Sequence, residues 1–314
     1  MIGDFNVLPT ISTVIPLYNK APHIAHTLAS VLSQKVLPLE IIVVDDGSTD
    51  NGADIVESLQ NPLIKLIRQT NQGESSARNA GLREAKGCYV AFLDADDYWY
   101  DNHIERLQHL IKSYPNAALF STMHEIFHDG TTIVPGMPYP QNFNGYVDDF
   151  FCRFANGLSL INSTTACVRK DAMLSVGGFP VGVKKGPDLI AWTRLALDYE
   201  VAHAAVITAV YNRDAVNRSV RMRESEAPGS LLYLSQLLSE VEGTHRRESI
   251  SLLFSRIAFY TCAGMCETGD YGSAISILKL VKDLGLWGLY IKIALLLSIP
   301  PKLLTFARRW RHRF

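Results

Sequence analysis

The sequence predicts an α/β fold in which a mostly parallel sheet is flanked by helices on both faces. Between Ile11 and Phe120, short β-branched runs alternate with stretches of helical periodicity, which is the pattern of repeated strand–helix units. The strand runs are continuously apolar, as in IIVV at 41–44, and this is typical of strands covered on both faces. A chain of 314 residues, 47% of them apolar, is also long enough to bury a large core.

The expected elements follow in chain order and divide the chain into three parts. Strands are expected at 11–15, 40–45, 63–68, 88–93 and 117–127, with helices at 21–34, 50–59, 75–86 and 101–112. Further on, strands at 164–168 and 201–210 flank a helix at 188–197, and helices follow at 230–242, 247–267 and 271–284. We therefore expect one domain over 1–225, a helical appendage over 226–283, and an apolar, basic tail over 284–314.

Four polar clusters each follow one of the first four predicted strands. They are PLYN at 16–19, DDGS at 45–48, NQGE at 71–74 and DADD at 94–97. In sheets of this kind the ligand crevice lies beyond the carboxyl ends of the strands. We therefore expect the four clusters to converge on one edge of the sheet and to form the functional site.

The acidic cluster predicts a site for a cation and a diphosphate. Asp94, Asp96 and Asp97 lie within four residues, and their charges repel one another unless a cation is present. Mg²⁺ prefers oxygen ligands and usually sits between one or two carboxylates and substrate phosphates. Two acids in a surface loop are common, but here the apolar run YVAFL leads directly into the cluster and places it at the end of a buried strand.

Other candidates at the same edge have structural alternatives. Asp46 lies at a strand tip, where an acid can accept hydrogen bonds from a base or ribose, although Asp and Ser here also suit the capping of the next helix. Tyr18 offers an aromatic face to a base, or is an ordinary core aromatic. Arg213 and Arg218 belong to a basic run that is either a diphosphate clamp or a solvated linker.

Four motifs carry a resemblance to a known family. VIPLYNK at 14–20, VVDDGSTD at 43–50, NQGESSARNAGL at 71–82 and FLDADDYW at 92–99 resemble glycosyltransferase family 2, and the resemblance covers about residues 10–220. It implies the Rossmann-like glycosyltransferase-A fold for 1–225, and an inverting, metal-dependent hexosyl- or hexosaminyltransferase that uses a nucleoside diphosphate sugar.

The resemblance also implies roles for individual residues. Positions that match the family's nucleotide-binding residues are Pro16, Tyr18, Asp46, Arg78 and Asp94. Asp96 matches the acid that binds Mg²⁺ or Mn²⁺, and Asp188 matches the catalytic base. The residue before Asp188 is Pro187, where the family has Glu, so the usual neighbour of the base is missing.

The end of the chain predicts contact with a membrane surface. After Asp283 there is no acid, while Lys292, Lys302 and four arginines supply six basic charges beside an apolar stretch rich in Leu and Ile. This pattern favours a helix that lies in the interface of an anionic membrane. The alternative is that the stretch packs on the helical appendage. No run reaches the ~18 apolar residues of a clear membrane span.

Compartment and acceptor follow from these features. Five scattered cysteines and no secretory signal favour a reducing compartment, so we expect a cytoplasmic protein peripheral on the inner face of the cell membrane. The resemblance implies a saccharide acceptor, lipid-linked, in the assembly of bacterial surface polysaccharide. A polyprenyl-phosphate glycosyltransferase and a non-catalytic nucleotide-sugar-binding module are the alternatives.

Two further classes of function are set aside. The net charge of −1 argues against a nucleic-acid binder. The segment His124-Glu125-Ile126-Phe127-His128 spells a zinc protease signature, which requires a helix. The surrounding residues predict a strand, in which side chains four apart are ~13 Å from each other. A phospho-acceptor receiver domain fits neither the chain length nor the later Asp-x-Asp.

Overall fold

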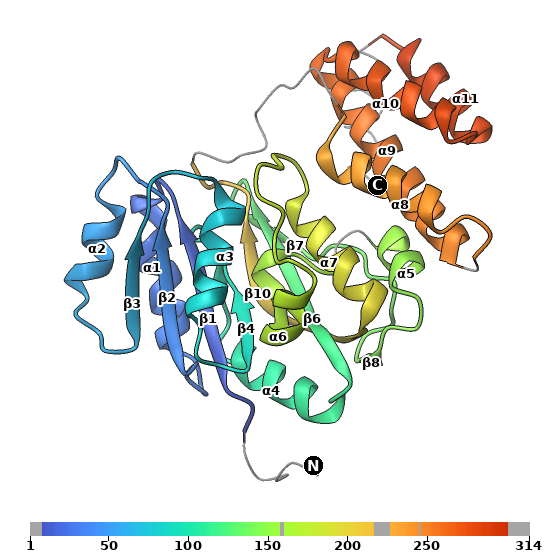
Figure 1. The fold of residues 1–314 in the computed structure, drawn as a ribbon. Coiled ribbons are helices and arrows are strands. Elements are labelled where there is room, and N and C mark those ends of the chain that lie inside the picture. Colours follow the sequence, from blue (N-terminus) through green and yellow to red (C-terminus); the bar gives the residue numbers. More distant parts are fainter. Residues whose placement is uncertain (1–7, 158–159, 217–226, 245, 301–314) are drawn as a thin grey trace. The chain divides into compact units, whose positions relative to one another are not determined.

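The chain folds into two units (Figure 1). A computed structural model describes residues 8–157, 160–216, 227–244 and 246–300. Unit 1 comprises residues 1–183 and 187–218, and unit 2 comprises 184–186 and 219–314. Each unit is described by itself below.

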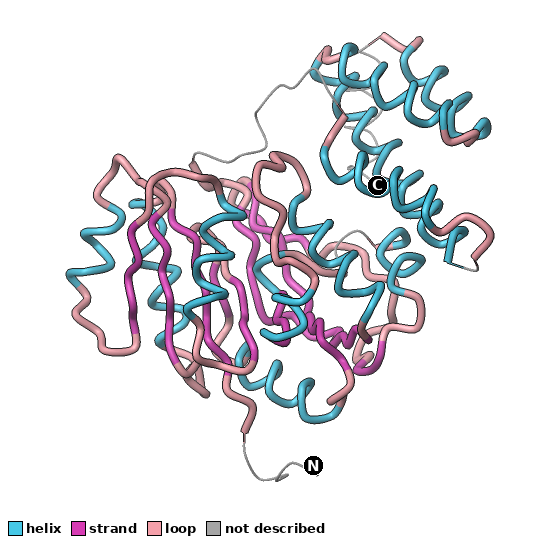
Figure 2. The backbone as a smooth tube through the Cα atoms, in the orientation of Figure 1, coloured by secondary structure: helices cyan, strands magenta, loops and turns pink. Residues whose placement is uncertain are grey.

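A ten-stranded sheet forms the centre of unit 1 (Figure 2). The strands are β1 (Ile11–Leu17), β2 (Glu40–Asp45), β3 (Ile64–Arg68), β4 (Tyr89–Phe92), β5 (Tyr98–Trp99), β6 (Ala117–His128), β7 (Thr131–Ile133), β8 (Asn144–Tyr146), β9 (Ala166–Arg169) and β10 (Glu200–Asn212). Their order is β3-β2-β1-β4-β9-β6-β10-β5, with β7 beside β6 and β8 beside β10.

Most strands along this order point the same way. β1, β2, β3 and β4 pair in parallel, β9 runs antiparallel between β4 and β6, and β6 pairs in parallel with β10. The two antiparallel steps cancel, so β6 and β10 share the direction of β1. The carboxyl ends of six strands therefore lie at one edge of the sheet.

Helices cover both faces of the sheet, as the sequence predicts (Figure 1). They are α1 (Ala21–Leu32), α2 (Gly52–Ser58), α3 (Glu74–Glu84), α4 (His103–Ser113), α5 (Phe150–Asn156), α6 (Lys170–Ser175) and α7 (Pro187–Asp198). α1, α2 and α4 share a hydrophobic core with alternate residues of β1 and β2, such as Ile15 and Val43. α3 packs on the opposite face. All six residues of β2 are buried, because the strand is covered on both sides.

Gly81 allows α3 to lie close to the sheet. A Cβ atom at this position would lie 2.4 Å from Cγ1 of Val14 in β1. Any larger residue would push the helix away from the strand. This contact sets the distance between α3, which carries Arg78, and the sheet whose strand ends carry the acidic residues.

The described residues of unit 2 form four helices. They are α8 (Gly229–Glu240), α9 (Arg246–Thr268), α10 (Tyr271–Asp283) and α11 (Trp287–Leu297). Their core includes Leu234, Phe254 and Ile277, and Cys262 and Cys266 are free and buried. Asp270 caps α10 by accepting a hydrogen bond from the Ser273 amide at 3.3 Å.

One described helix, α9, is long and apolar enough to cross a membrane by length and composition alone. An 18-residue window of this helix has a mean hydropathy of 1.3, and 39% of that window is buried inside the protein. The core helix of a helical bundle meets the same criterion. The sequence shows no unbroken apolar run of this length, because charged residues such as Arg256 interrupt it.

The predicted fold class is confirmed, and the long elements begin and end within a few residues of the expected positions. The elements that the sequence did not indicate are short: β5, β7, β8, α5 and α6 have two to seven residues each. Segments of this length carry too few residues for a hydrophobic period to be visible. The sheet is mixed rather than uniformly parallel because β9 inserts in the reverse direction.

Replacing Gly81 with Ala should destabilise unit 1 by about 1–3 kcal/mol, because the new methyl group overpacks the contact with Val14. Chemical denaturation of the full chain measures the change. The control is Gly264→Ala in α9, where a Cβ atom meets no atom within 4 Å. That variant should keep or raise stability, since Ala favours a helix over Gly. Equal stability of Gly81→Ala and the parent chain would contradict the close approach of α3.

Candidate functional site

The loops after β1 and β2 are tied together by two polar side chains. Oδ1 of Asn19 accepts hydrogen bonds from the amides of Thr49 at 2.7 Å and Asp50 at 3.3 Å. Asp50 in turn accepts from the Ala21 amide at 2.9 Å. Asn19 has a positive φ of 51°, a conformation that Asn tolerates better than most residues. These bonds hold the two loops as one rigid rim of the site.

Asp46 organises the loop after β3. Its Oδ1 accepts hydrogen bonds from Nε2 of Gln69 at 2.6 Å and from the Gln72 amide at 2.9 Å, and its Oδ2 accepts from the Gly73 amide at 2.7 Å. Only 3% of the residue is exposed. Asp46 therefore holds the backbone of residues 72 and 73, which lead into α3. The predicted contact with a nucleotide base would use the oxygen lone pairs that these bonds leave.

Arg78 is the central cation of the site. Its Nη2 binds Oδ1 of Asp94 at 2.6 Å and also contacts the carboxylate of Glu74 one turn earlier in α3. The side chain is 2% exposed, and its guanidinium lies over the ring of Phe179, 5.4 Å from the ring centre. Burial alone would lower the pKa of Arg78, but the charges of Glu74, Asp94 and Asp188 outweigh it and raise the pKa above its ordinary value.

Asn79, the next residue of α3, fixes the segment that leads to α7. Its Nδ2 donates to the Phe179 carbonyl at 2.7 Å, and its Oδ1 accepts from the Phe179 amide at 2.9 Å. Gly178 leaves room for this pair, since a Cβ atom there would lie 2.5 Å from Oδ1 of Asn79. The ring of Phe179 packs edge-on against Trp192 of α7, with ring centres 5.4 Å apart. α3 and α7 are thus held together through one loop.

Asp188 lies in the first turn of α7 and belongs to the same charge network. Burial raises the pKa of Asp188 above the ordinary carboxyl value, the positive charge of Arg78 opposes that rise, and the negative charge of Asp94 adds to it. Arg78 therefore binds Asp94 at the end of β4 and lies close enough to Asp188 on α7 for its charge to act on that carboxyl group. The structure brings together three residues that lie 16 to 110 positions apart in the sequence.

Asp96 is paired with a lysine. Nζ of Lys20 lies 2.6 Å from Oδ2 of Asp96, and the same nitrogen donates to the Val216 carbonyl at 2.6 Å. The two side chains are 13% and 15% exposed. A bound ammonium shows that this carboxylate attracts a cation, and its hard oxygen atoms suit Mg²⁺ or Mn²⁺. The residues present therefore fit a divalent ion at Asp96.

Asp97 has a structural role and does not join the other two acids. Its Oδ1 accepts from the Asn212 amide at 2.8 Å, and its Oδ2 accepts from the hydroxyl of Thr164. Burial raises the pKa of Asp97 well above its ordinary value, and the charges of Asp94 and Asp96 add to this rise. Of the three acids in the predicted cation cluster, Asp97 is therefore excluded as a cation ligand, and Asp94 and Asp96 remain. Asp97 instead connects the cluster to the end of β10.

The remaining predicted residues lie around this centre. Pro16 is in β1, and Tyr18 follows at its carboxyl end with 45% of its surface exposed. Arg213 follows β10, and its backbone amide donates to the Phe127 carbonyl at 2.8 Å. Arg218, the other half of the predicted clamp, lies outside the described residues, as do Arg221 and Arg223.

The zinc protease signature lies in β6, as the sequence predicts. His124 is buried, and burial lowers its pKa to about 4. His128 lies at the exposed end of the strand and binds Oδ1 of Asp214 at 2.9 Å. His128, Asp129 and Asp214 form a group whose potential ligand atoms lie within 4.8 Å of one another. All three residues are exposed, and their bonds close the turn after β6.

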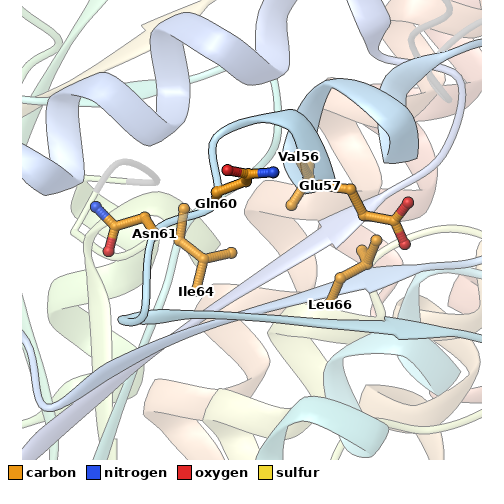
Figure 3. A pocket seen from close by; sticks show the side chains of 6 residues that line it. All are labelled: Val56, Glu57, Gln60, Asn61, Ile64 and Leu66. Carbon is orange, nitrogen blue, oxygen red and sulfur yellow. The ribbon is translucent and has the colours of Figure 1, made fainter.

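A hollow of about 200 Å³ lies at the other edge of the sheet (Figure 3). Its lining residues are Val56, Glu57, Gln60, Asn61, Ile64 and Leu66. Ile64 is the first residue of β3, so the hollow is at the amino end of that strand, away from the acidic cluster. It does not contribute to the site described above.

Sequence reasoning missed four residues that shape the site. Lys20 and Asn79 lie inside motifs that the sequence singled out, Glu74 lies in a predicted polar cluster, and Thr164 starts a predicted strand. Glu74 and Arg78 are four residues apart in α3, a spacing that does indicate an ion pair once the helix is taken to begin at Glu74. No pattern in the sequence pairs Lys20 with Asp96, Asn79 with Phe179, or Thr164 with Asp97. These three pairings span 67 to 100 positions and exist only because the fold brings the segments together.

Two proteins with established names are similar to this chain in sequence. The hyaluronan synthase of Pasteurella multocida is 35% identical over 142 residues, which are 44% of this chain and 15% of the synthase. The chondroitin synthase of Pasteurella multocida (strain Pm70) is 28% identical over 282 residues, which are 88% of this chain and 28% of the synthase. The chain thus spans less than a third of the length of these two relatives.

The fold also matches a solved structure. Residues 1–349 of S. aureus TarS, in complex with UDP-GlcNAc, superimpose with a TM-score of 0.73 at 19% identity, over 88% of this chain and 80% of that chain. This likeness concerns the fold. The model of Glycosyl transferase family 2 matches residues 12–173, more than half of the 314 residues. The chain therefore belongs to glycosyltransferase family 2.

Proposed function

We propose that this enzyme transfers a hexose or hexosamine from a nucleoside diphosphate sugar to a saccharide acceptor, with inversion at the anomeric carbon. The observation that carries the proposal is that Arg78 binds Asp94 and that both charges act on Asp188 in the first turn of α7. A candidate proton acceptor therefore lies within electrostatic range of Asp94, which matches the family's nucleotide-binding residue.

The reaction is a single displacement. An acceptor hydroxyl attacks the anomeric carbon, and the bond from that carbon to the diphosphate oxygen breaks, so the electron pair leaves with the nucleoside diphosphate. The hydroxyl proton passes to the carboxylate of Asp188. A carboxyl group with a raised pKa is a stronger base than an ordinary one, and general-base help is typically worth ~10²–10⁴ in rate.

Positive charge is needed where the diphosphate leaves. A Mg²⁺ or Mn²⁺ ion at Asp96 would supply it by neutralising the developing charge. Tyr18 is exposed at the strand end and can stack on the base, and Arg213, which follows β10, can bind a phosphate.

Donor and acceptor classes are proposed from the similar proteins. Hyaluronan and chondroitin synthases build polysaccharides, and the structural neighbour holds UDP-GlcNAc. We therefore propose a uridine diphosphate sugar as donor and a lipid-linked saccharide of bacterial surface polysaccharide as acceptor. A polyprenyl phosphate acceptor is the alternative, and an acceptor assay with both lipids separates them.

We also propose that the enzyme is peripheral on the cytoplasmic face of the cell membrane. Trp287, Ile291 and Leu295 follow one another at four-residue steps along α11, with 58%, 56% and 62% of their surfaces exposed. Lys292 lies beside them, and no acid follows Asp283 in the sequence. An apolar helical face bordered by basic charge suits the interface of an anionic membrane.

Replacing Asp188 with Asn should abolish sugar transfer while donor binding remains, because an amide cannot accept the proton. In the parent enzyme, transfer should fall as the pH drops through the pKa of Asp188, which lies above the ordinary carboxyl value near 4. Product formation over a pH series and donor binding by calorimetry measure both effects. Asp198→Asn, at the exposed opposite end of α7, is the control and should keep its activity. Near-normal turnover by Asp188→Asn would refute its role as base.

Removing divalent ions with a chelator should stop transfer, and Mg²⁺ or Mn²⁺ should restore it. Asp96→Asn should lose Mn²⁺ binding in calorimetry, because it removes the carboxylate that fits the ion. Asp101→Asn is the matched control, since Asp101 pairs with Lys35 on the surface and is 57% exposed. Transfer that persists without any divalent ion would exclude the proposed role of Asp96.

Replacing Trp287, Ile291 and Leu295 together with Ser should reduce sedimentation of the enzyme with vesicles that contain phosphatidylglycerol. Binding of the parent enzyme should also weaken at high salt, because each basic residue near an anionic surface contributes ~1 kcal/mol. Ile275→Ser, which removes an exposed apolar residue of α10, is the control. If the triple variant instead loses self-association without a change in vesicle binding, the stripe is a contact between copies of the chain.

A further inference from the structure

Lys20 occupies the oxygen that the proposed cation would need. Its Nζ lies 2.6 Å from Oδ2 of Asp96, and both side chains are largely shielded from solvent. Two other lysine–carboxylate pairs of the described residues, Lys35–Asp101 and Lys65–Glu84, have side chains that are 45% to 58% exposed. The pair at Asp96 is therefore the shielded one, and water screens its charges least.

The position of Lys20 is set by the loop that carries it. Lys20 follows Asn19, which adopts a positive φ and is held by the amides of Thr49 and Asp50. It precedes α1, whose first residue, Ala21, donates its amide to Asp50. The backbone on both sides of Lys20 is thus fixed, and its side chain is directed to Asp96 by a rigid turn.

Lys20 also holds the segment after β10. Its Nζ donates to the Val216 carbonyl at 2.6 Å, and the Val216 amide donates to Nε2 of His23 in α1 at 3.4 Å. One ammonium group therefore bridges the acidic cluster and the chain that leaves the sheet just after Arg213. Anything that removes Lys20 from Asp96 also disturbs this second contact.

We propose that Lys20 is a built-in competitor of the divalent cation at Asp96, and that cation binding releases Val216. This inference rests on the proposed function, which places the cation on Asp96. Two positive charges on one carboxylate oxygen repel each other, so the ion and the ammonium exclude each other there. Because coupling between two binding events is reciprocal, the contact with Val216 must weaken cation binding by the same factor by which the cation weakens that contact.

The test compares Mn²⁺ binding to the full chain by calorimetry in the parent protein, Lys20→Met and Lys35→Met. Lys20→Met should bind Mn²⁺ about fivefold more tightly, in line with the loss of one competing ion pair. Lys35→Met removes an equally charged residue from a surface pair and should bind as the parent does. Lys20→Met with Asp96→Asn should bind no Mn²⁺, which locates the measured site at Asp96. Melting curves show that each variant is folded.

Hydrogen exchange at the Val216 amide gives a second readout. Mn²⁺ should speed its exchange in the parent protein, whereas in Lys20→Met the exchange should already be fast and should not respond. If Lys20→Met binds Mn²⁺ as tightly as the parent or more weakly, the inference is overturned. If Asp96→Asn loses Mn²⁺ binding in the same experiment, the cation site at Asp96 is still supported. If transfer proceeds and neither the parent nor Lys20→Met binds Mn²⁺, the cation part of the proposed function fails as well.

Discussion

A buried arginine is the interaction on which the rest of the site depends. Arg78 is 2% exposed; its guanidinium binds Glu74 and Asp94, lies over the ring of Phe179, and is within electrostatic range of Asp188. An unpaired charge at this depth would be costly, and breaking such a pair typically costs about 3–5 kcal/mol. The arginine therefore requires the carboxylates, and its positive charge opposes the rise that burial causes in the pKa of Glu74 and of Asp188.

The acidic residues at this edge of the sheet have different partners, although all of them are aspartates that lie at the end of a strand. Asp46 holds backbone amides of a loop, Asp94 binds Arg78, and Asp97 joins Thr164 to the end of β10. Asp96 alone among these four is paired with a flexible ammonium, that of Lys20. Asp46, Asp94 and Asp97 are thus held by groups of the fold itself, whereas Asp96 is held by a lysine side chain. A carboxylate whose partner is a lysine ammonium suits the proposed site, which must bind and release a charged ligand.

The frame also explains how distant segments meet in one site. Six strands end at the same edge, and Gly81 and Gly178 remove the side-chain atoms that would keep α3 from the sheet and from the Phe179 loop. Asn79 then joins that loop to α3 by two hydrogen bonds. The glycines and the asparagine act through geometry, while the charged residues act through the cation and proton that the proposed reaction handles.

The sequence by itself determined the fold class, the long strands and helices, and the acidic strand ends, because continuous apolar runs and polar clusters are local patterns. It also determined that HEIFH lies in a strand. Only the tertiary structure decided which partner each acid has. Lys20 meets Asp96 across 76 positions and Thr164 meets Asp97 across 67, and such pairings depend on strand order and register, which a local pattern does not contain. The insertion of β9 between β4 and β6 was hidden for the same reason, since the direction of a strand is set by its neighbours and not by its own residues.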